Sequence, residues 1–293
     1  MIIATFALLR FVAYMASTLL FGASAMLALS GSRGLRLSVE ADLRKVLRGA
    51  SVAGMLSVLC LLPLQTASIA GEWQAMAQTD MLATVALQTR YGQAWILRAA
   101  AMLLVLCLFL RPRPDWTWPR ALASGLALLP LALSGHAAME EGRTGLLHAL
   151  NDMLHCLAAG FWLGSLPVFL LILRRWTEPA CRADATRALM RFSTAGHVAV
   201  AVLLLSGVVN AVLILSPEGL DIASAYQQWL GLKILLALAM TVLAIMNRYW
   251  WVPRIRRQPE IALGPLRRNT VLEVCVGVAI LLIVSALGLS APQ

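Results

Sequence analysis

Histidine is the side chain in this sequence best suited to metal chemistry, because a neutral imidazole is a common metal ligand and binds copper in either oxidation state. The sequence has four histidines, all after residue 135, and they are His136, His148, His155 and His197. Met139 and Glu141 follow His136 closely, so a nitrogen, a thioether and a carboxylate occur together. Such a donor set predicts an entry site for an ion of copper's softness. Packing is the alternative role for the methionine.

His148 and His155 are predicted to share one helix face. They are seven residues apart, a turn of about 700°, which leaves them about 10.5 Å apart in height on nearly the same side. Asp152 lies between them, close enough to interact with both rings, and a carboxylate beside an imidazole sets its tautomer and raises its basicity. An ion could therefore pass from one ring to the next and then to His197. A hydrogen bond to a neighbouring helix is the alternative role for His197.

The composition is that of a membrane protein. Of the 293 residues 60% are hydrophobic and only 13% are charged, with a mean hydropathy of +0.79, whereas soluble proteins carry about 25% charged residues. A water-soluble enzyme is excluded. The net charge of +10 does not form a basic patch interleaved with aromatics, so no nucleic-acid partner is expected. There is no GxxxxGK[ST] motif for nucleotide binding. We therefore expect a lipid-embedded transporter with no catalytic residues.

The apolar runs predict an all-α integral membrane protein, a bundle of eight transmembrane helices. The runs are 3–30, 47–70, 92–110, 120–138, 147–173, 192–216, 229–250 and 269–290. Nineteen of the 24 basic residues fall in the loops after the first, third, fifth and seventh runs or in the run ends that border these loops. By the positive-inside rule these loops are cytoplasmic, which places both termini and the loops at 71–91, 136–146 and 217–228 in the periplasm.

Ionisable residues inside spans are functional candidates, because the hydrocarbon makes their charge costly. Arg10, Arg98, Asp152 and Lys233 all fall within about 6–12 Å of the outer boundary and are predicted to form one polar layer. Arg98 and Lys233 could alternatively extend outward along their long stems. A buried carboxylate needs a partner, and we expect an Arg10–Asp152 ion pair.

The two halves of the chain show a weak internal similarity. A shift of 142 residues aligns Gly22 with Gly164 and Arg10 with Asp152. This pattern predicts two parallel four-helix repeats within the single membrane domain, over 1–138 and 139–293. Chance matches between apolar segments are the alternative.

Over roughly residues 90–290 the sequence resembles the copper resistance protein D family of bacterial inner-membrane proteins. The resemblance is carried by Gly135-His136-Ala137, His148, Asn151, His155, Phe161-Trp162-Leu163-Gly164, Gly196-His197, Ser206-Gly207-Val208-Val209-Asn210 and Asn247-Arg248-Tyr249. It implies copper handling at the bacterial inner membrane, a periplasmic copper carrier of the CopC type as partner, and the four histidines as ligands. Asn151 joins the supporting polar layer. Tyr14 stands where many members have a histidine in the first helix, and whether that helix contributes a ligand is left open.

The leading hypothesis is a copper transporter. Copper, as Cu(I) or Cu(II), is taken at the periplasmic mouth by His136 with Met139 or Glu141, passed to His148 and His155, and released past His197. One alternative is a haem-binding electron carrier or reductase, which needs two imidazoles facing each other at one depth. Another is a copper-sensing or assembly subunit that transports nothing. The direction of transport and the oligomeric state are left open.

Overall fold

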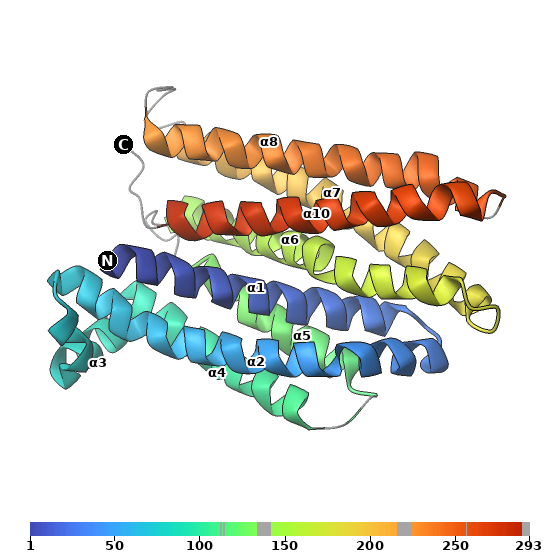
Figure 1. Ribbon diagram of the computed structural model, residues 1–293. Coiled ribbons are helices and arrows are strands. Elements are labelled where there is room, and N and C mark those ends of the chain that lie inside the picture. Colours follow the sequence, from blue (N-terminus) through green and yellow to red (C-terminus); the bar gives the residue numbers. More distant parts are fainter. Residues whose placement is uncertain (112, 114, 134–141, 216–223, 256, 289–293) are drawn as a thin grey trace.

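Helices form almost all of the chain in the computed structural model, which describes residues 1–111, 113, 115–133, 142–215, 224–255 and 257–288. The helices run side by side as one elongated bundle (Figure 1), so the all-α prediction is confirmed. The α-helices are α1 (Ile2–Leu29), α2 (Arg33–Ala70), α3 (Thr79–Gln88), α4 (Arg90–Leu110), α5 (Thr117–Leu128), α6 (Gly142–Trp176), α7 (Arg182–Leu215), α8 (Ala225–Met246), α9 (Val252–Ile255) and α10 (Pro259–Leu287). The shorter turns are η1 (Trp73–Ala77), η2 (Leu129–Leu131) and the π-helical η4 (Asn247–Trp251).

Seven helical segments in the described part of the chain are long and apolar enough to cross a membrane. They are Ile2–Leu29, Arg33–Ala70, Arg90–Leu110, Gly142–Trp176, Arg182–Leu213, Ala225–Ile255 and Pro259–Leu287. The predicted span 120–138 overlaps α5 and η2, and its last residues lie outside the described ranges. The count of eight spans therefore stays a prediction, whereas a multi-pass bundle is established.

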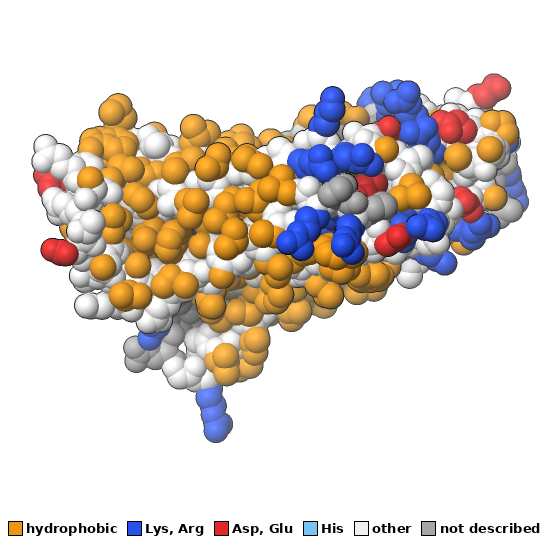
Figure 2. All heavy atoms as spheres, turned by 90° about the horizontal axis from the view of Figure 1, so that it is seen from below, with side chains coloured by type: hydrophobic (Ala, Val, Ile, Leu, Met, Phe, Trp, Pro, Cys, Tyr) orange, Lys and Arg blue, Asp and Glu red, His pale blue; other side chains and the backbone are white. Residues whose placement is uncertain are grey.

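Three helices begin well before the predicted spans, all at the same end of the bundle. α2, α7 and α10 start at Arg33, Arg182 and Pro259, ten to fourteen residues earlier than the apolar runs. The backbone hydrogen bonds of a helix continue across the point where charged residues replace apolar ones, and hydropathy marks only the apolar part. Figure 2 shows Lys and Arg side chains gathered toward this end, beside a broad hydrophobic surface. We call it the basic end.

The opposite end departs from prediction between α2 and α4. Residues 71–91 were expected to form a loop, but η1 and α3 occupy most of this stretch. Thr89 ends α3 and caps α4, since its hydroxyl accepts from the Gly92 amide at 2.9 Å. The same end holds the start of α1 and the end of α10 (Figure 1).

Two glycines bring α1 and α6 into backbone contact near the centre of the bundle. A Cβ atom on Gly164 would overlap the Thr18 carbonyl, and one on Gly22 would overlap Gly164 itself. Small residues at such a crossing let two helices in a membrane approach closely. Gly22 and Gly164 are also the pair that the 142-residue shift aligns, although the repeat itself stays a prediction.

Substituting valine for Gly164 should destabilise the protein by at least about 1–3 kcal/mol, because overpacking forces the backbones of α1 and α6 apart. The matched control is Gly231→Val in α8, where an added Cβ meets no atom within 4 Å. Thermal unfolding of both variants in detergent measures the difference. Equal midpoints would mean that α1 and α6 can move apart without loss of stability.

Candidate functional site

Polar side chains from α6 and α7 meet in the half of the bundle away from the basic end. The Asn151 Nδ2 donates to the Asn210 Oδ1 at 2.7 Å and to the Ser206 carbonyl at 3.0 Å. Asn210 Nδ2 donates to Asp152 Oδ1 at 3.0 Å, and His155 Nδ1 lies 3.0 Å from Ser206 Oγ. The four-residue spacings 151–155 and 206–210 place these groups on facing stripes of the two helices. We call these five residues the α6–α7 polar cluster.

The hydrogen bonds of this cluster define the tautomer of His155. Ser206 Oγ lies 2.6 Å from the Val202 carbonyl and 3.2 Å from the Leu203 carbonyl, so its one proton is directed to the backbone. This arrangement favours the tautomer in which His155 Nδ1 donates to Ser206 Oγ and the lone pair is on Nε2. Gly207 leaves room for the ring, since a Cβ there would stand 3.5 Å from the imidazole. An imidazole held at one nitrogen with the other free is the arrangement found in metal-binding histidines.

Charged residues from α4 and α8 surround this cluster. Lys233 interacts electrostatically with Asp152 and with His155. Cys156, in turn, lies within electrostatic range of Asp152, Lys233 and Arg98, so these groups converge near one level of the bundle. The single polar layer that the sequence predicts, which also includes Arg10, stays a prediction.

Arg98 points into the bundle, which excludes the alternative that it extends outward. It is 6% exposed, and its Nε and Nη2 have no hydrogen-bond partner. The guanidinium lies 5.4 Å from the centre of the Tyr14 ring, a contact between a cation and an aromatic face. A charge held this way is only partly compensated, so the layer keeps positive charge.

The expected Arg10–Asp152 ion pair is not formed between these two described residues. Arg10 instead donates to the Tyr14 hydroxyl and, at 2.7 Å, to the Gly288 carbonyl. Tyr14 is one turn away on the same helix, and Gly288 follows the last residue of α10, where helix carbonyls lack intrahelical partners. Asp152 is bound by Asn210. The prediction was wrong because sequence spacing gives depth but not the direction in which a long side chain turns.

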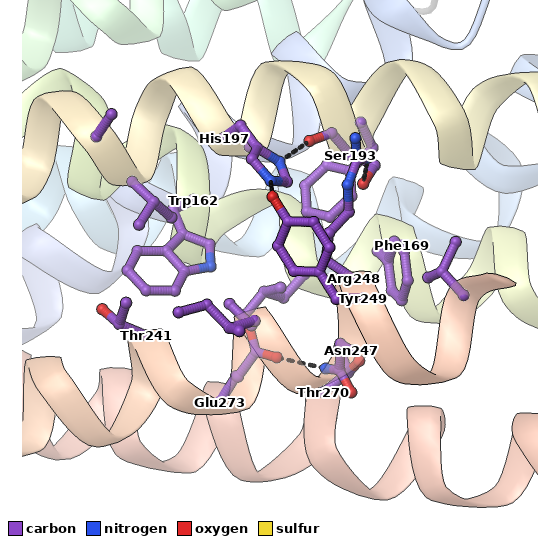
Figure 3. Close-up of a pocket in the computed structure, with 18 of the residues that line it drawn as sticks. Trp162, Phe169, Ser193, His197, Thr241, Asn247, Arg248, Tyr249, Thr270 and Glu273 are labelled. Atoms are coloured by element: carbon purple, nitrogen blue, oxygen red, sulfur yellow. Dashed lines mark hydrogen bonds between the residues drawn. The ribbon is translucent and has the colours of Figure 1, made fainter.

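A second polar region surrounds a pocket of about 390 Å³ between α6, α7, α8, η4 and α10 (Figure 3). Glu273 is its most buried ionisable group, at 3% exposure. Its Oε1 accepts from Asn247 Nδ2 at 2.6 Å, and Asn269 donates to Asn247 Oδ1 at 3.1 Å. Asn247 opens the π-helical turn η4, and such turns occur often at functional sites.

His197 lies at the rim of this pocket with both ring nitrogens engaged. Nδ1 is 2.7 Å from the Ser193 carbonyl, so it must donate, and Nε2 accepts from the Tyr249 hydroxyl at 3.0 Å. The hydrogen bond to a neighbouring helix that the sequence allowed is thus confirmed. A metal ion at Nε2 would first have to displace Tyr249.

The histidines do not form a continuous chain in the described part of the structure. Ser206, level with His155, follows His197 by nine residues on α7, or about 13.5 Å. Val200 and Leu203 lie between the two levels on α7 and belong to an apolar cluster built on Trp162, Leu166 and Met240. No two described imidazoles therefore face each other at one depth, as the haem alternative requires.

The remaining predicted ligands divide into two groups. His148 is buried on α6, two turns before His155. His136, Met139 and Glu141 lie outside the described residues. Within the described ranges no group of three or more His, Cys, Asp or Glu side chains is placed to hold a metal ion.

Sequence reasoning missed Glu273, and it named Asn247 only through the family resemblance. The signal was present, because Glu273 is a carboxylate inside the predicted span 269–290 and belonged among the costly intramembrane charges. Its partner Asn247 belongs to η4, and no spacing along the chain brings the two residues together.

Comparison with known proteins agrees with this architecture. A family model described as "Copper resistance protein D-like, N-terminal domain" matches residues 1–146, and one described as "Copper resistance protein D" matches residues 186–287. The chain belongs to the copper resistance protein D family. Copper resistance protein D of Pseudomonas syringae pv. tomato is 31% identical over 97% of this chain and 96% of its own length. No solved structure matches the chain.

Two further relatives of this chain differ from each other in the share of their own length that matches it. Inner membrane protein YebZ of Escherichia coli (strain K12) is 33% identical, covering 98% of both chains. Copper transport protein CutJ of Bacillus subtilis (strain 168) is 31% identical over 82% of this chain, which corresponds to 44% of its own length. With seven membrane-length helices, this family member is a multi-pass inner-membrane protein.

Proposed function

We propose that this protein moves copper ions across the bacterial inner membrane. The observation that carries the proposal is the His155 imidazole, whose Nδ1 is held by Ser206 inside a polar cluster between α6 and α7. Membership of the copper resistance protein D family and similarity to a relative named as a copper transport protein support copper as the ion. The chain would act in transport rather than catalysis.

In the proposed orientation the basic end faces the cytoplasm and both termini face the periplasm, as the positive-inside rule favours. α5 with the residues after it would complete an eighth crossing. Copper, delivered by a periplasmic carrier of the CopC type, would enter at His136 with Met139 or Glu141. It would then pass to His148 and His155.

Beyond His155 the ion must cross the apolar cluster before it reaches His197. We propose that the helices shift to open this step during transport, as in proteins that expose a site to each side in turn. Release would follow at the rim of the inner pocket, where Tyr249 has to give up its hydrogen bond to His197.

Cu(I) fits the cationic surroundings of this route better than Cu(II). Arg98 and Lys233 lie near the α6–α7 polar cluster, and the repulsion between like charges doubles when the charge of the ion doubles. Imidazole and thioether donors also suit Cu(I).

Copper flux into vesicles tests the proposal. Protein reconstituted into liposomes that contain a Cu(I)-binding dye should raise the dye signal well above that of protein-free liposomes, and Zn(II) offered to a matched dye should not enter. Copper flux equal to that of protein-free liposomes would overturn transport and favour a sensing or assembly role.

Removing the charge of Lys233 should tighten copper binding about tenfold, because a cation near His155 and Asp152 repels a bound metal ion. The variant is Lys233→Met, which keeps the length of the side chain, and Lys233→Arg is the control that keeps the charge. Competition of the purified proteins with a Cu(I) chelator measures the affinity. Weaker binding in Lys233→Met would indicate that copper does not bind beside this lysine.

A further inference from the structure

The inner pocket reaches the outer surface of the bundle between α7 and α8. Ile245 and Tyr249 both line the pocket, yet their exposures are 51% and 66%, and His197 at the rim is exposed as well. The surrounding surface is apolar, with Val198 at 63% and Val242 at 55% exposure. Hydrocarbon rather than water therefore borders this opening, and a ligand would enter from the bilayer.

The opening is bridged by side chains from its two sides. The described hydrogen bonds that join α7 to η4 are His197 with Tyr249 and Ser193 with Arg248 (Figure 3). Both are made by side chains, which rotate far more readily than helices separate. A ligand could break either hydrogen bond on entering the pocket without unfolding a helix.

The interior combines aromatic walls with a polar floor. Trp162, Phe169 and Phe192 line the pocket, and Glu273 with Asn247 stands at its floor. Gly196 lines it too, and a Cβ added to this glycine would meet no atom within 4 Å, so the wall there faces open space. A volume of about 390 Å³ lies within the range of small-molecule sites.

The charges and hydrogen bonds of the pocket select the class of ligand. The Glu273 carboxylate accepts hydrogen bonds and repels anions, which disfavours a phosphate head group at the floor. Tyr249 and His197 offer donor and acceptor groups at the rim. Flat aromatic walls favour a ring. A matching ligand is neutral and lipid-soluble, with a hydroxyl for Glu273 at one end and an oxygen for the rim at the other.

We propose that this pocket binds the ring of a membrane quinone in its hydroquinone form. One hydroxyl donates to Glu273, the other oxygen bonds at the His197–Tyr249 rim, and the ring lies among Trp162, Phe169 and Phe192. The apolar tail leaves between α7 and α8 into the bilayer. The site shares His197 and Tyr249 with the proposed copper exit, but hydroquinone binding can be measured without copper.

Fluorescence titration tests the proposal. The full-length protein in nanodiscs of quinone-free phospholipid is titrated with the short-chain hydroquinone decylubiquinol, under a reducing atmosphere. Wild type should show saturable quenching of tryptophan fluorescence. Trp162→Phe should lose most of this quenching but still bind the ligand, so that adding the variant to wild type lowers the quenching of wild type. Empty nanodiscs mixed with free tryptophan show the quenching caused by partition of the ligand into lipid, which rises linearly with concentration. If quenching of wild type also rises linearly, the ligand only partitions into lipid and the proposed binding site is wrong.

Two variants locate the site. Gly196→Leu fills the open space and should weaken decylubiquinol binding at least tenfold, whereas Glu273→Gln should weaken it about fivefold by removing the charge of the acceptor. His155→Ala, outside the pocket, is the control and should bind as wild type does. Unfolding midpoints show whether each variant is folded. If folded Gly196→Leu binds as tightly as wild type, the ligand lies elsewhere and the proposal fails.

Discussion

Copper uptake should fall at least tenfold when His155 is replaced by alanine and should keep the wild-type rate when Leu154 is replaced. His155 belongs to the α6–α7 polar cluster and is held there through Nδ1, whereas the neighbouring Leu154 is 55% exposed on the outer surface. Loss of a residue that merely orients a metal ligand costs about 10–100-fold in metal affinity, so loss of the ligand itself should cost no less. The proteoliposome flux assay with a Cu(I)-binding dye measures both variants.

Ser206→Ala provides an intermediate case for the same experiment. It keeps the imidazole of His155 but removes the oxygen that accepts from Nδ1. The ring can then turn or change tautomer, and we expect uptake between that of wild type and that of His155→Ala. If folded His155→Ala carries copper as fast as wild type, the ion bypasses the α6–α7 polar cluster, and transport would have to be assigned to other residues.

Hydropathy predicted where the spans lie but not where the helices end. The apolar run at 47–70 misses the first part of α2, which begins at Arg33, because charged residues outside the hydrocarbon keep helical hydrogen bonds just as apolar ones do. The same limit hid α3 in the predicted loop at 71–91. A transfer scale measures preference for the membrane, and it carries little information about helix propensity in water.

The candidate site was predictable only where it lies along one helix. Periodicity placed Asp152 beside His155, and both belong to the α6–α7 polar cluster. Ser206 and Asn210 entered the sequence analysis only through the family resemblance, since the register between two helices depends on how their surfaces pack. The wrong partner for Arg10 has the same origin, because the Gly288 carbonyl that binds it is 278 residues away.

Stability should depend most strongly on a buried ion pair near the basic end. Arg120 on α5 and Glu40 on α2 are 6% and 7% exposed, with Nη1 and Oε1 2.6 Å apart. Arg120→Met should lower the free energy of unfolding by about 3–5 kcal/mol, because it leaves a buried carboxylate without its cation. The exposed pair of Arg33 with Asp115 is the control, and Arg33→Met should cost less than about 1 kcal/mol. Unfolding in detergent, followed by circular dichroism, measures both.

The two partners should not be equivalent, since Arg120 has further acceptors. Its Nε donates to the Leu108 carbonyl at 3.1 Å and its Nη2 to the Arg111 carbonyl at 3.0 Å, so it also satisfies the end of α4. Glu40→Leu leaves those two bonds in place and should cost less than Arg120→Met. The double variant no longer has an unpaired buried charge, but the Leu108 and Arg111 carbonyls still lack their donor. Its free energy of unfolding should therefore lie between that of Arg120→Met and that of wild type. Full recovery would show that the ion pair alone matters, and a double variant as unstable as Arg120→Met would show that the carbonyl bonds dominate.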